Sequence, residues 1–127
     1  MATILCIEDN EQNQYLIRYL LEKRGHAVVL AGDGSEGIRL ATELLPELIL
    51  LDIQLPGMDG YQVAGILKGI PQLAAIPIVA VTSYAMVGDR ERAIASGCSA
   101  YIEKPIDPAA FPGQVEEHLP GQSRKAD

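Results

Sequence analysis

Basic residues are scarce in this sequence. Its 127 residues include 10 Lys and Arg against 17 Asp and Glu, so the formal net charge is −7 and the pI is about 4.7. Proteins that bind nucleic acids neutralise the backbone phosphates with Lys and Arg. The charge balance therefore argues against a nucleic-acid partner.

Cysteines and long apolar runs are also few. Cys6 and Cys98 are the two cysteines, and they have neither metal-ligand spacing nor the density of a disulfide scaffold. Both are interpreted as buried thiols in a reducing cytosol. No apolar stretch reaches the roughly 18 residues that a membrane-spanning helix needs, and no basic segment precedes the first apolar run. We expect a cytoplasmic protein with no membrane partner.

The length predicts a single domain. A chain of this size buries roughly two-thirds of the surface that it exposes when unfolded, so it can form a core without disulfides or metals. With 48% hydrophobic residues, the composition is that of an ordinary globular protein. We expect one domain over residues 1–120 and a short frayed tail over residues 121–127.

Short apolar runs alternate with longer amphipathic stretches along the chain. The runs have strand length and little polar alternation, which is typical of strands covered on both faces. They are Ile4–Ile7, Ala27–Leu30, Leu48–Leu51, Ile76–Val81 and a weaker run at Ala100–Ile102. Strands that alternate with helices predict right-handed βαβ units. The fold class is therefore α/β, with a mostly parallel sheet and helices on both faces.

Capping and breaking residues give approximate bounds for five helices. The first begins after Asn10, ends at Gly25 and carries Tyr15, Leu16, Tyr19 and Leu20; the second covers residues 34–45, with Ile38, Ala41, Leu44 and Leu45 facing inward. The third follows Asp59 and Gly60, the fourth covers residues 85–96, and the fifth begins near Pro108 with Asp107 as its cap. Pro112 and Gly113 fall inside the fifth helix, which we expect to be short or kinked.

Polar residues follow four of the apolar runs. Functional groups of an open parallel sheet gather outside the carboxyl ends of its strands. The residues found there are Glu8, Asp9, Asp52, Thr82 and Lys104. If the first, third, fourth and fifth strands are neighbours, these side chains converge on one edge of the sheet.

Three adjacent carboxylates repel one another unless a cation binds or one of them is protonated. Oxygen ligands without His or Cys favour a hard cation, and Mg²⁺ commonly shares one or two carboxylates with a phosphate. Thr82 and Lys104 offer a hydroxyl and an ammonium for the oxygens of a phosphoryl group. Asp52 is then the expected covalent acceptor, as an aspartyl phosphate.

Each of these residues also has a purely structural interpretation. Asp9, Asn10 and Thr82 are common helix caps, Asp52 precedes a Pro-Gly turn, and Lys104 suits a solvated loop. A purely structural origin would require an acid pair, another acid, a hydroxyl and a lysine to stand at four strand ends by chance. Their joint position therefore favours a functional site, although no single residue does.

The same residues resemble the receiver domain of two-component response regulators, and the similarity extends from Ile4 to about Leu119. The matching segments are CIEDN at 6–10, LDIQLPGMDG at 51–60, VAVTS at 79–83 and GCSAYIEKP at 97–105. The resemblance implies a flavodoxin-like (βα)5 three-layer sandwich with strand order 2-1-3-4-5.

The resemblance also implies a role for each site residue. Glu8, Asp9, Asp52 and the backbone carbonyl of Gln54 would hold Mg²⁺, and Asp52 would accept the phosphoryl group; Thr82 and Lys104 would contact its oxygens. Tyr101 is similar to the switch aromatic of the family, and the bond between Lys104 and Pro105 is similar to the family's cis peptide bond. Tyr84 is similar to a position that tunes the lifetime of the phosphoryl group.

A histidine kinase or histidine phosphotransfer protein is the phosphoryl donor that this resemblance implies. The expected output is phosphorylation-dependent binding of a target protein to the face made by the fourth helix, fifth strand and fifth helix. The pattern at residues 8–13 and at Ala85 and Met86 is similar to stand-alone regulators of the DivK type, and we expect a monomer or weak dimer.

Three alternatives remain. Receivers attached to hybrid histidine kinases share the matching stretches. Phosphatases of the haloacid dehalogenase type also use an Asp nucleophile with Mg²⁺, but they need a second Asp where Gln54 stands. A flavin-binding module of the flavodoxin type is disfavoured because Glu8 and Asp9 would repel a phosphate without a metal.

Overall fold

The computed structural model describes residues 2–83 and 88–120. Three features expected from the sequence lie outside the described residues. These are the tuning position Tyr84, the pattern at Ala85 and Met86, and the tail at residues 121–127.

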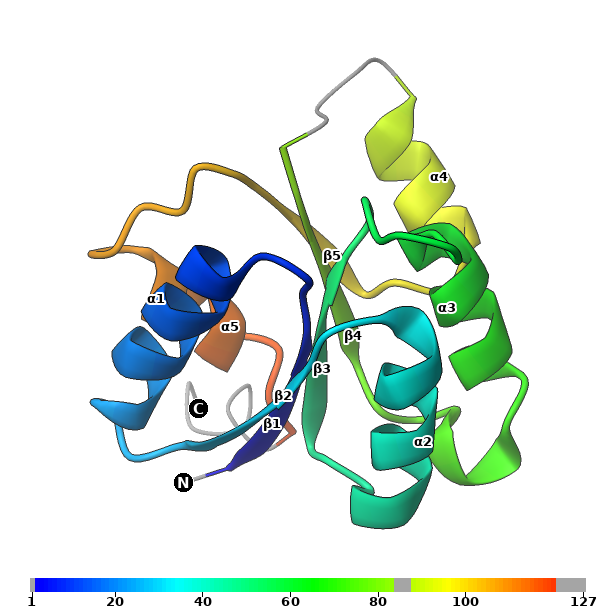
Figure 1. Ribbon diagram of the computed structural model, residues 1–127, viewed down its shortest axis with the longest axis horizontal. Helices are drawn as coiled ribbons and strands as arrows, with labels where there is room; N and C mark the ends of the chain where they lie inside the picture. Colours follow the sequence, from blue (N-terminus) through cyan, green and yellow to red (C-terminus); the bar gives the residue numbers. More distant parts are fainter. Residues whose placement is uncertain (1, 84–87, 121–127) are drawn as a thin grey trace.

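Five strands of the described chain form one parallel sheet (Figure 1). They are β1 (Thr3–Ile7), β2 (Ala27–Ala31), β3 (Leu48–Asp52), β4 (Ile78–Thr82) and β5 (Ala100–Glu103). Their order is β2-β1-β3-β4-β5, which confirms the predicted topology. Every residue of β3 and β4 is buried, as the unbroken apolar runs predict for central strands covered on both faces.

Helices cover both faces of the sheet. They are α1 (Glu11–Glu22), α2 (Gly34–Leu44), α3 (Gly60–Lys68), the 3-10 turn η1 (Pro71–Leu73), α4 (Asp89–Ala95) and α5 (Phe111–Glu116). Figure 1 shows α1 and α5 on one side and α2, α3 and α4 on the other, so the three-layer prediction is confirmed. The core accordingly divides into two apolar clusters, one on each side of the sheet. None of the helices in the described ranges is both long and apolar enough to cross a membrane.

The tyrosines by which the sequence marks α1 are not its buried residues, although Leu20 does pack against the core. Ile17 and Leu21 are at most 1% exposed, whereas Tyr15 and Tyr19 are 73% and 51% exposed. Both pairs have the i, i+4 spacing that places side chains on one helix face. The tyrosines instead stack on each other at the surface, with ring centroids 6.4 Å apart.

The end of α2 also differs from the prediction. Ala41 is buried and Ile38 packs against the core, but Leu44 and Leu45 are 43% and 53% exposed. Leu45 has a φ of 49°, so the helix ends at Leu44 in a left-handed cap and neither leucine reaches the core.

The last helix begins later than expected, and the expected start of the fourth helix, at residue 85, lies outside the described residues. The Asp107 carboxylate accepts from Ala109 N–H at 3.0 Å and its carbonyl from Phe111 N–H at 2.8 Å, so residues 108–110 form a turn and α5 starts at Phe111. Pro112 then lies in the first helical turn, where no N–H is needed. The helix is short, with six residues from Phe111 to Glu116. Helix α4 begins after Gly88, whose φ is 94°.

Candidate functional site

The register of the sheet brings the site residues to one edge. Ile7 pairs with Leu51, and Asp52 pairs with Val81, so Glu8, just beyond β1, lies next to Asp52, the last residue of β3. Thr82 is the last residue of β4 and is 1% exposed. These positions result from parallel pairing of apolar runs, which is why the strand ends could be predicted to converge.

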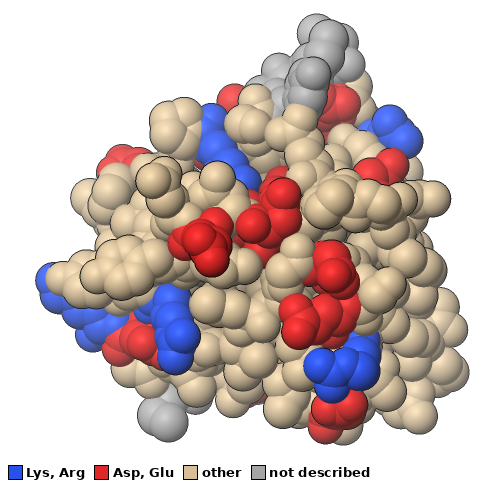
Figure 2. Space-filling view, in the orientation of Figure 1, with Lys and Arg blue, Asp and Glu red and all other residues tan. Residues whose placement is uncertain are grey.

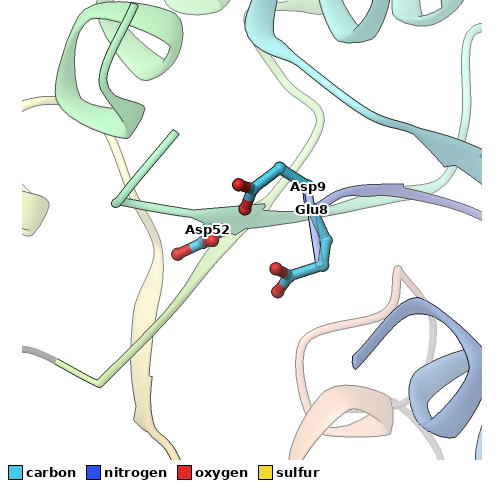
Figure 3. A group of neighbouring side chains, drawn as sticks. All are labelled: Glu8, Asp9 and Asp52. Carbon is cyan, nitrogen blue, oxygen red and sulfur yellow. The ribbon is translucent and has the colours of Figure 1, made fainter. Parts of the chain in front are cut away.

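Three carboxylates lie together at this edge (Figure 3). Glu8, Asp9 and Asp52 each offer an oxygen, and these oxygens all lie within 4.8 Å of one another. Glu8 and Asp52 are buried, whereas Asp9 is exposed. Figure 2 shows acidic side chains gathered near the middle of the face seen in Figure 1. The carboxylates border a cleft of about 480 Å³ that is lined by Glu8, Asp9, Asn10, Asn13, Asp52, Gln54, Ser83, Lys104 and Pro105.

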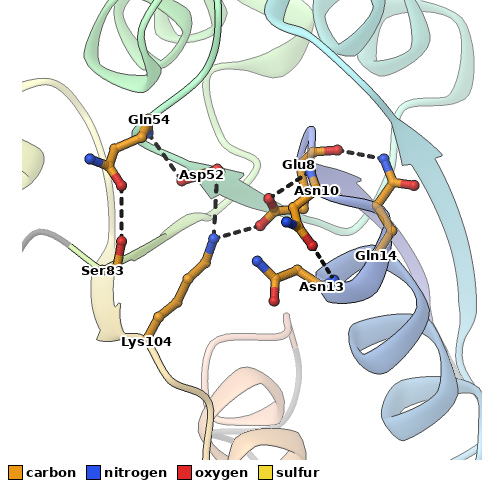
Figure 4. Close-up of polar contacts among 8 residues, drawn as sticks. All are labelled: Glu8, Asn10, Asn13, Gln14, Asp52, Gln54, Ser83 and Lys104. Atoms are coloured by element: carbon orange, nitrogen blue, oxygen red, sulfur yellow. Dashed lines mark hydrogen bonds and ion pairs between the residues drawn. The ribbon is translucent and has the colours of Figure 1, made fainter.

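Lys104 places a positive charge beside two of the carboxylates (Figure 4). Its Nζ lies 2.7 Å from Glu8 Oε1 and 3.6 Å from Asp52 Oδ2. Its backbone N–H donates to the Thr82 carbonyl at 2.8 Å, which positions the residue just beyond β5. The bond from Lys104 to Pro105 is cis, as the resemblance implied.

One lysine does not balance three carboxylates. Burial raises the pKa of Asp52 to about 7, the Glu8 charge adds to this, and the Gln54 N–H and Lys104 oppose it. A group whose charged form is disfavoured in this way gains from an added cation. The donors are all oxygens, which suits Mg²⁺. The residues present therefore fit a magnesium ion.

Gln54 connects the loops after β3 and β4. Its backbone N–H donates to Asp52 Oδ1 at 3.0 Å, and its side-chain Oε1 accepts from Ser83 Oγ at 2.9 Å (Figure 4). The metal-binding role of its carbonyl stays a prediction. The link to Ser83 was missed by sequence reasoning, because it joins residues far apart in the chain and neither loop carries a local signal for it.

Tyr101 lies away from the carboxylates. It belongs to β5, is half-buried and packs against the cluster of core residues beneath α2, α3 and α4. Burial raises the pKa of its hydroxyl, and so do the nearby charges of Asp89, Tyr61 and Glu103. The structure thus places Tyr101 beside α4, on the opposite side of the sheet from α1 and α5.

The fold and the carboxylate cleft define a protein of the receiver class. Residues 4–116 match the family model for the response regulator receiver domain, and the chain belongs to this family. Among its relatives is the polar-differentiation response regulator DivK of Brucella anthropi, 43% identical over 117 residues that cover 92% of this chain and 95% of that protein. DivK of Brucella abortus is likewise 43% identical over 117 residues.

Solved structures agree with this assignment. The receiver domain of a sensor histidine kinase from Pseudomonas aeruginosa, with a magnesium ion coordinated in its active-site cleft, has a TM-score of 0.85 and 32% identity, covering 92% of this chain and 96% of that one. Chemotaxis protein CheY4 of Vibrio cholerae has a TM-score of 0.89 over 94% of this chain and 99% of that one. Its identity is 23%, so it supports the fold alone.

Proposed function

We propose that this protein accepts a phosphoryl group on Asp52 from a phosphohistidine of a histidine kinase or histidine phosphotransfer protein. The observation that carries the proposal is the position of Lys104 Nζ, 2.7 Å from Glu8 and 3.6 Å from Asp52, at an edge where three carboxylates meet. A reactive carboxylate with an ammonium beside it is what phosphoryl transfer to Asp requires.

In this reaction an Asp52 oxygen forms a P–O bond while the P–N bond to the donor imidazole breaks, and the ring nitrogen keeps the bonding electron pair. Lys104 would stabilise the negative charge on the phosphoryl oxygens, and Thr82, at the end of β4, would bind another of them. Glu8, Asp9, Asp52 and the Gln54 carbonyl would hold Mg²⁺, which neutralises charge on the phosphoryl oxygens when bound.

The bond between Gln54 N–H and Asp52 Oδ1 positions the acceptor carboxylate. This hydrogen bond engages Oδ1, and the other carboxylate oxygen, Oδ2, lies on the side of Lys104. Water later attacks the aspartyl phosphate, releases inorganic phosphate and restores the Asp52 carboxylate. The protein would therefore act as a timed switch rather than a turnover enzyme.

The output that we propose is phosphorylation-dependent binding of a target protein to the face of α4, β5 and α5. The 43% identity to DivK over 95% of that protein supports a regulator of that type. We propose that it is a stand-alone, cytoplasmic monomer or weak dimer whose domain is residues 1–120. The likeness to a kinase receiver keeps attachment to a hybrid histidine kinase as the second candidate.

Labelling with acetyl phosphate in the presence of Mg²⁺ tests the proposal. We expect one phosphoryl group per molecule in the wild type and none in Asp52→Asn. Asp33→Asn is the matched control, because Asp33 caps α2 and Asn caps about as well. Labelling that persists in Asp52→Asn would disprove the assignment. Sustained turnover of a phosphate monoester would favour a phosphatase instead.

A further inference from the structure

Helix α4 is held to the rest of the protein by little apolar packing. Among its described residues Ala93 is buried, whereas Ile94 is 47% exposed. The neighbouring helix α3 differs, because Val63, Ala64 and Leu67 are all fully buried and a capping box of Asp59 and Gln62 fixes its start. Because α4 buries so little apolar surface, a side-chain contact to a neighbouring helix adds to what holds it in place.

The clearest such contact joins Arg92 and Tyr61. The Arg92 guanidinium carbon lies 4.1 Å from the centroid of the Tyr61 ring, within the range of a cation–π interaction. Tyr61 belongs to the first turn of α3 and packs against the apolar core, so its ring is held in place. Arg92 is exposed and belongs to α4. The contact thus attaches a weakly packed helix to a strongly packed one.

A second group of side chains lies at the same junction. Burial and the Asp89 charge raise the pKa of Tyr61, and burial and Asp89 also raise that of Tyr101. The Asp89 carboxylate is therefore near both phenols. Asp89 and Arg92 are three residues apart, so they lie on the same face of α4. This face contacts α3 through Tyr61 and approaches the expected switch residue, Tyr101, on β5.

We propose that Arg92 and Tyr61 form a clamp that holds α4 in the resting arrangement and thereby sets how readily occupancy of Asp52 shifts the α4 and β5 face. This inference rests on the proposed function. Arg92 and Tyr61 are positioning residues, since neither lines the carboxylate cleft. Loss of the clamp makes the shifted arrangement more populated before any phosphoryl group binds.

The affinity for a phosphoryl mimic reports that population. A ligand that binds one arrangement has an apparent Kd equal to its intrinsic Kd divided by the fraction already in that arrangement. An exposed cation–π contact corresponds to about a two- to five-fold change in such an equilibrium. Beryllofluoride with Mg²⁺ is the probe, because it mimics a phosphoryl group on a carboxylate.

The test compares Arg92→Ala with Arg90→Ala. Arg90 is exposed on the same helix, so its removal changes the net charge equally without touching Tyr61. We expect Arg92→Ala to bind beryllofluoride about two- to five-fold more tightly than Arg90→Ala. Tyr61→Leu should behave like Arg92→Ala, and Tyr61→Phe, which keeps the ring, like the wild type. Equal or weaker binding by Arg92→Ala overturns the proposal.

Hydrogen exchange without beryllofluoride or Mg²⁺ separates this inference from the proposed function. The amides of residues 89–96 should exchange about two- to five-fold faster in Arg92→Ala than in Arg90→Ala. Equal rates would show that no clamp exists. If the wild type fails to bind beryllofluoride, the proposed function is wrong, and the exchange rates still decide whether Arg92 holds α4.

Discussion

Asp52 is the residue at which burial and charge conflict most strongly. Its pKa is raised to about 7, first by burial and then by Glu8, whereas an unfolded chain would ionise it near 3.8. Between these values the folded protein binds more protons than the unfolded one. Without metal, stability conferred at this site is therefore present at low pH and is lost as the pH rises toward 7.

Asp52→Asn should remove this pH dependence. In the presence of a chelator, we expect the variant to exceed the wild type in free energy of unfolding by on the order of 2 kcal/mol at pH 8, and by much less at pH 5. Urea unfolding at the two pH values measures the difference. Asp33→Asn should keep the wild-type dependence of the free energy of unfolding on pH. If the free energy of unfolding of Asp52→Asn changed with pH as much as that of the wild type, a raised pKa at this residue would be contradicted.

Two glycines of α3 have opposite steric surroundings. A Cβ on Gly60 would lie 2.5 Å from Ile53 Cα and 2.6 Å from the Asp52 carbonyl oxygen, both backbone atoms that cannot rotate away. A Cβ on Gly65 would meet nothing within 4 Å. The absence of a side chain at Gly60 is what lets α3 start directly against the end of β3.

We therefore expect Gly60→Ala to destabilise the protein by about 1–3 kcal/mol through overpacking. Gly65→Ala should stabilise it by about 0.5–1 kcal/mol, because it reduces the backbone entropy lost in a helix. Chemical denaturation of both variants gives the comparison. Similar effects of the two substitutions on stability would show that the backbone of Asp52 and Ile53 does not exclude a Cβ at residue 60.

At the scale of elements, the short helix α5 depends on polar contacts at its end. Glu116 pairs with Arg24, and its Oε2 lies 2.8 Å from Nε2 of the buried His26. His26 Nδ1 accepts the N–H of Ala2 at 3.2 Å. Burial raises the pKa of Glu116, but the hydrogen bonds from Arg24 and His26 together hold it below its usual value. The cluster joins α5 to the start of β2.

Glu116→Gln should weaken this junction by about 1 kcal/mol at pH 7, because Gln keeps an acceptor but loses the charge. A depressed acid pKa stabilises the fold above the unfolded value of 4.5, and this stabilisation is lost as the pH falls through the folded pKa. The difference from the wild type should therefore vanish in acid. Urea unfolding measures it, and Glu117→Gln, at an exposed neighbour, should have no such effect.

At the scale of the whole molecule, the parts of the fold that depend on apolar pattern were predictable from the sequence. Unbroken apolar runs predicted the central strands, and parallel topology then brought Glu8, Asp52 and Lys104 to one edge. The buried residues of α1 could not be identified from spacing, because Tyr15 and Tyr19 share the spacing of Ile17 and Leu21. Tertiary packing decides between two faces of equal periodicity.

Contacts between loops were not predictable in the same way. The Ser83 hydroxyl meets the Gln54 side chain, and Lys104 pairs with Glu8, across 29 and 96 residues of chain. Such pairs depend on where several strands end in space, and no local pattern encodes them. The late start of α5 has a local origin instead, since the Asp107 contacts to Ala109 and Phe111 stabilise a turn that helix propensity alone does not indicate.

Folding brings three carboxylates of this acidic chain together, so the stability of the whole molecule should depend on a cation. A ligand that binds only the folded protein stabilises it by about 2.7 kcal/mol when its concentration is a hundred times its Kd. Mg²⁺ should therefore raise the Tm, because the Glu8, Asp9 and Asp52 oxygens are brought together only by folding.

Thermal unfolding with increasing MgCl2, against NaCl at equal ionic strength, measures this effect. NaCl corrects for screening of the net charge of −7, which any salt provides. Asp9→Asn should lose most of the Mg²⁺-dependent rise, whereas Asp33→Asn, which removes the same charge from the start of α2, should retain it. A rise that NaCl reproduces, or that Asp9→Asn retains in full, would mean that the cation acts on the surface charge rather than at the three carboxylates.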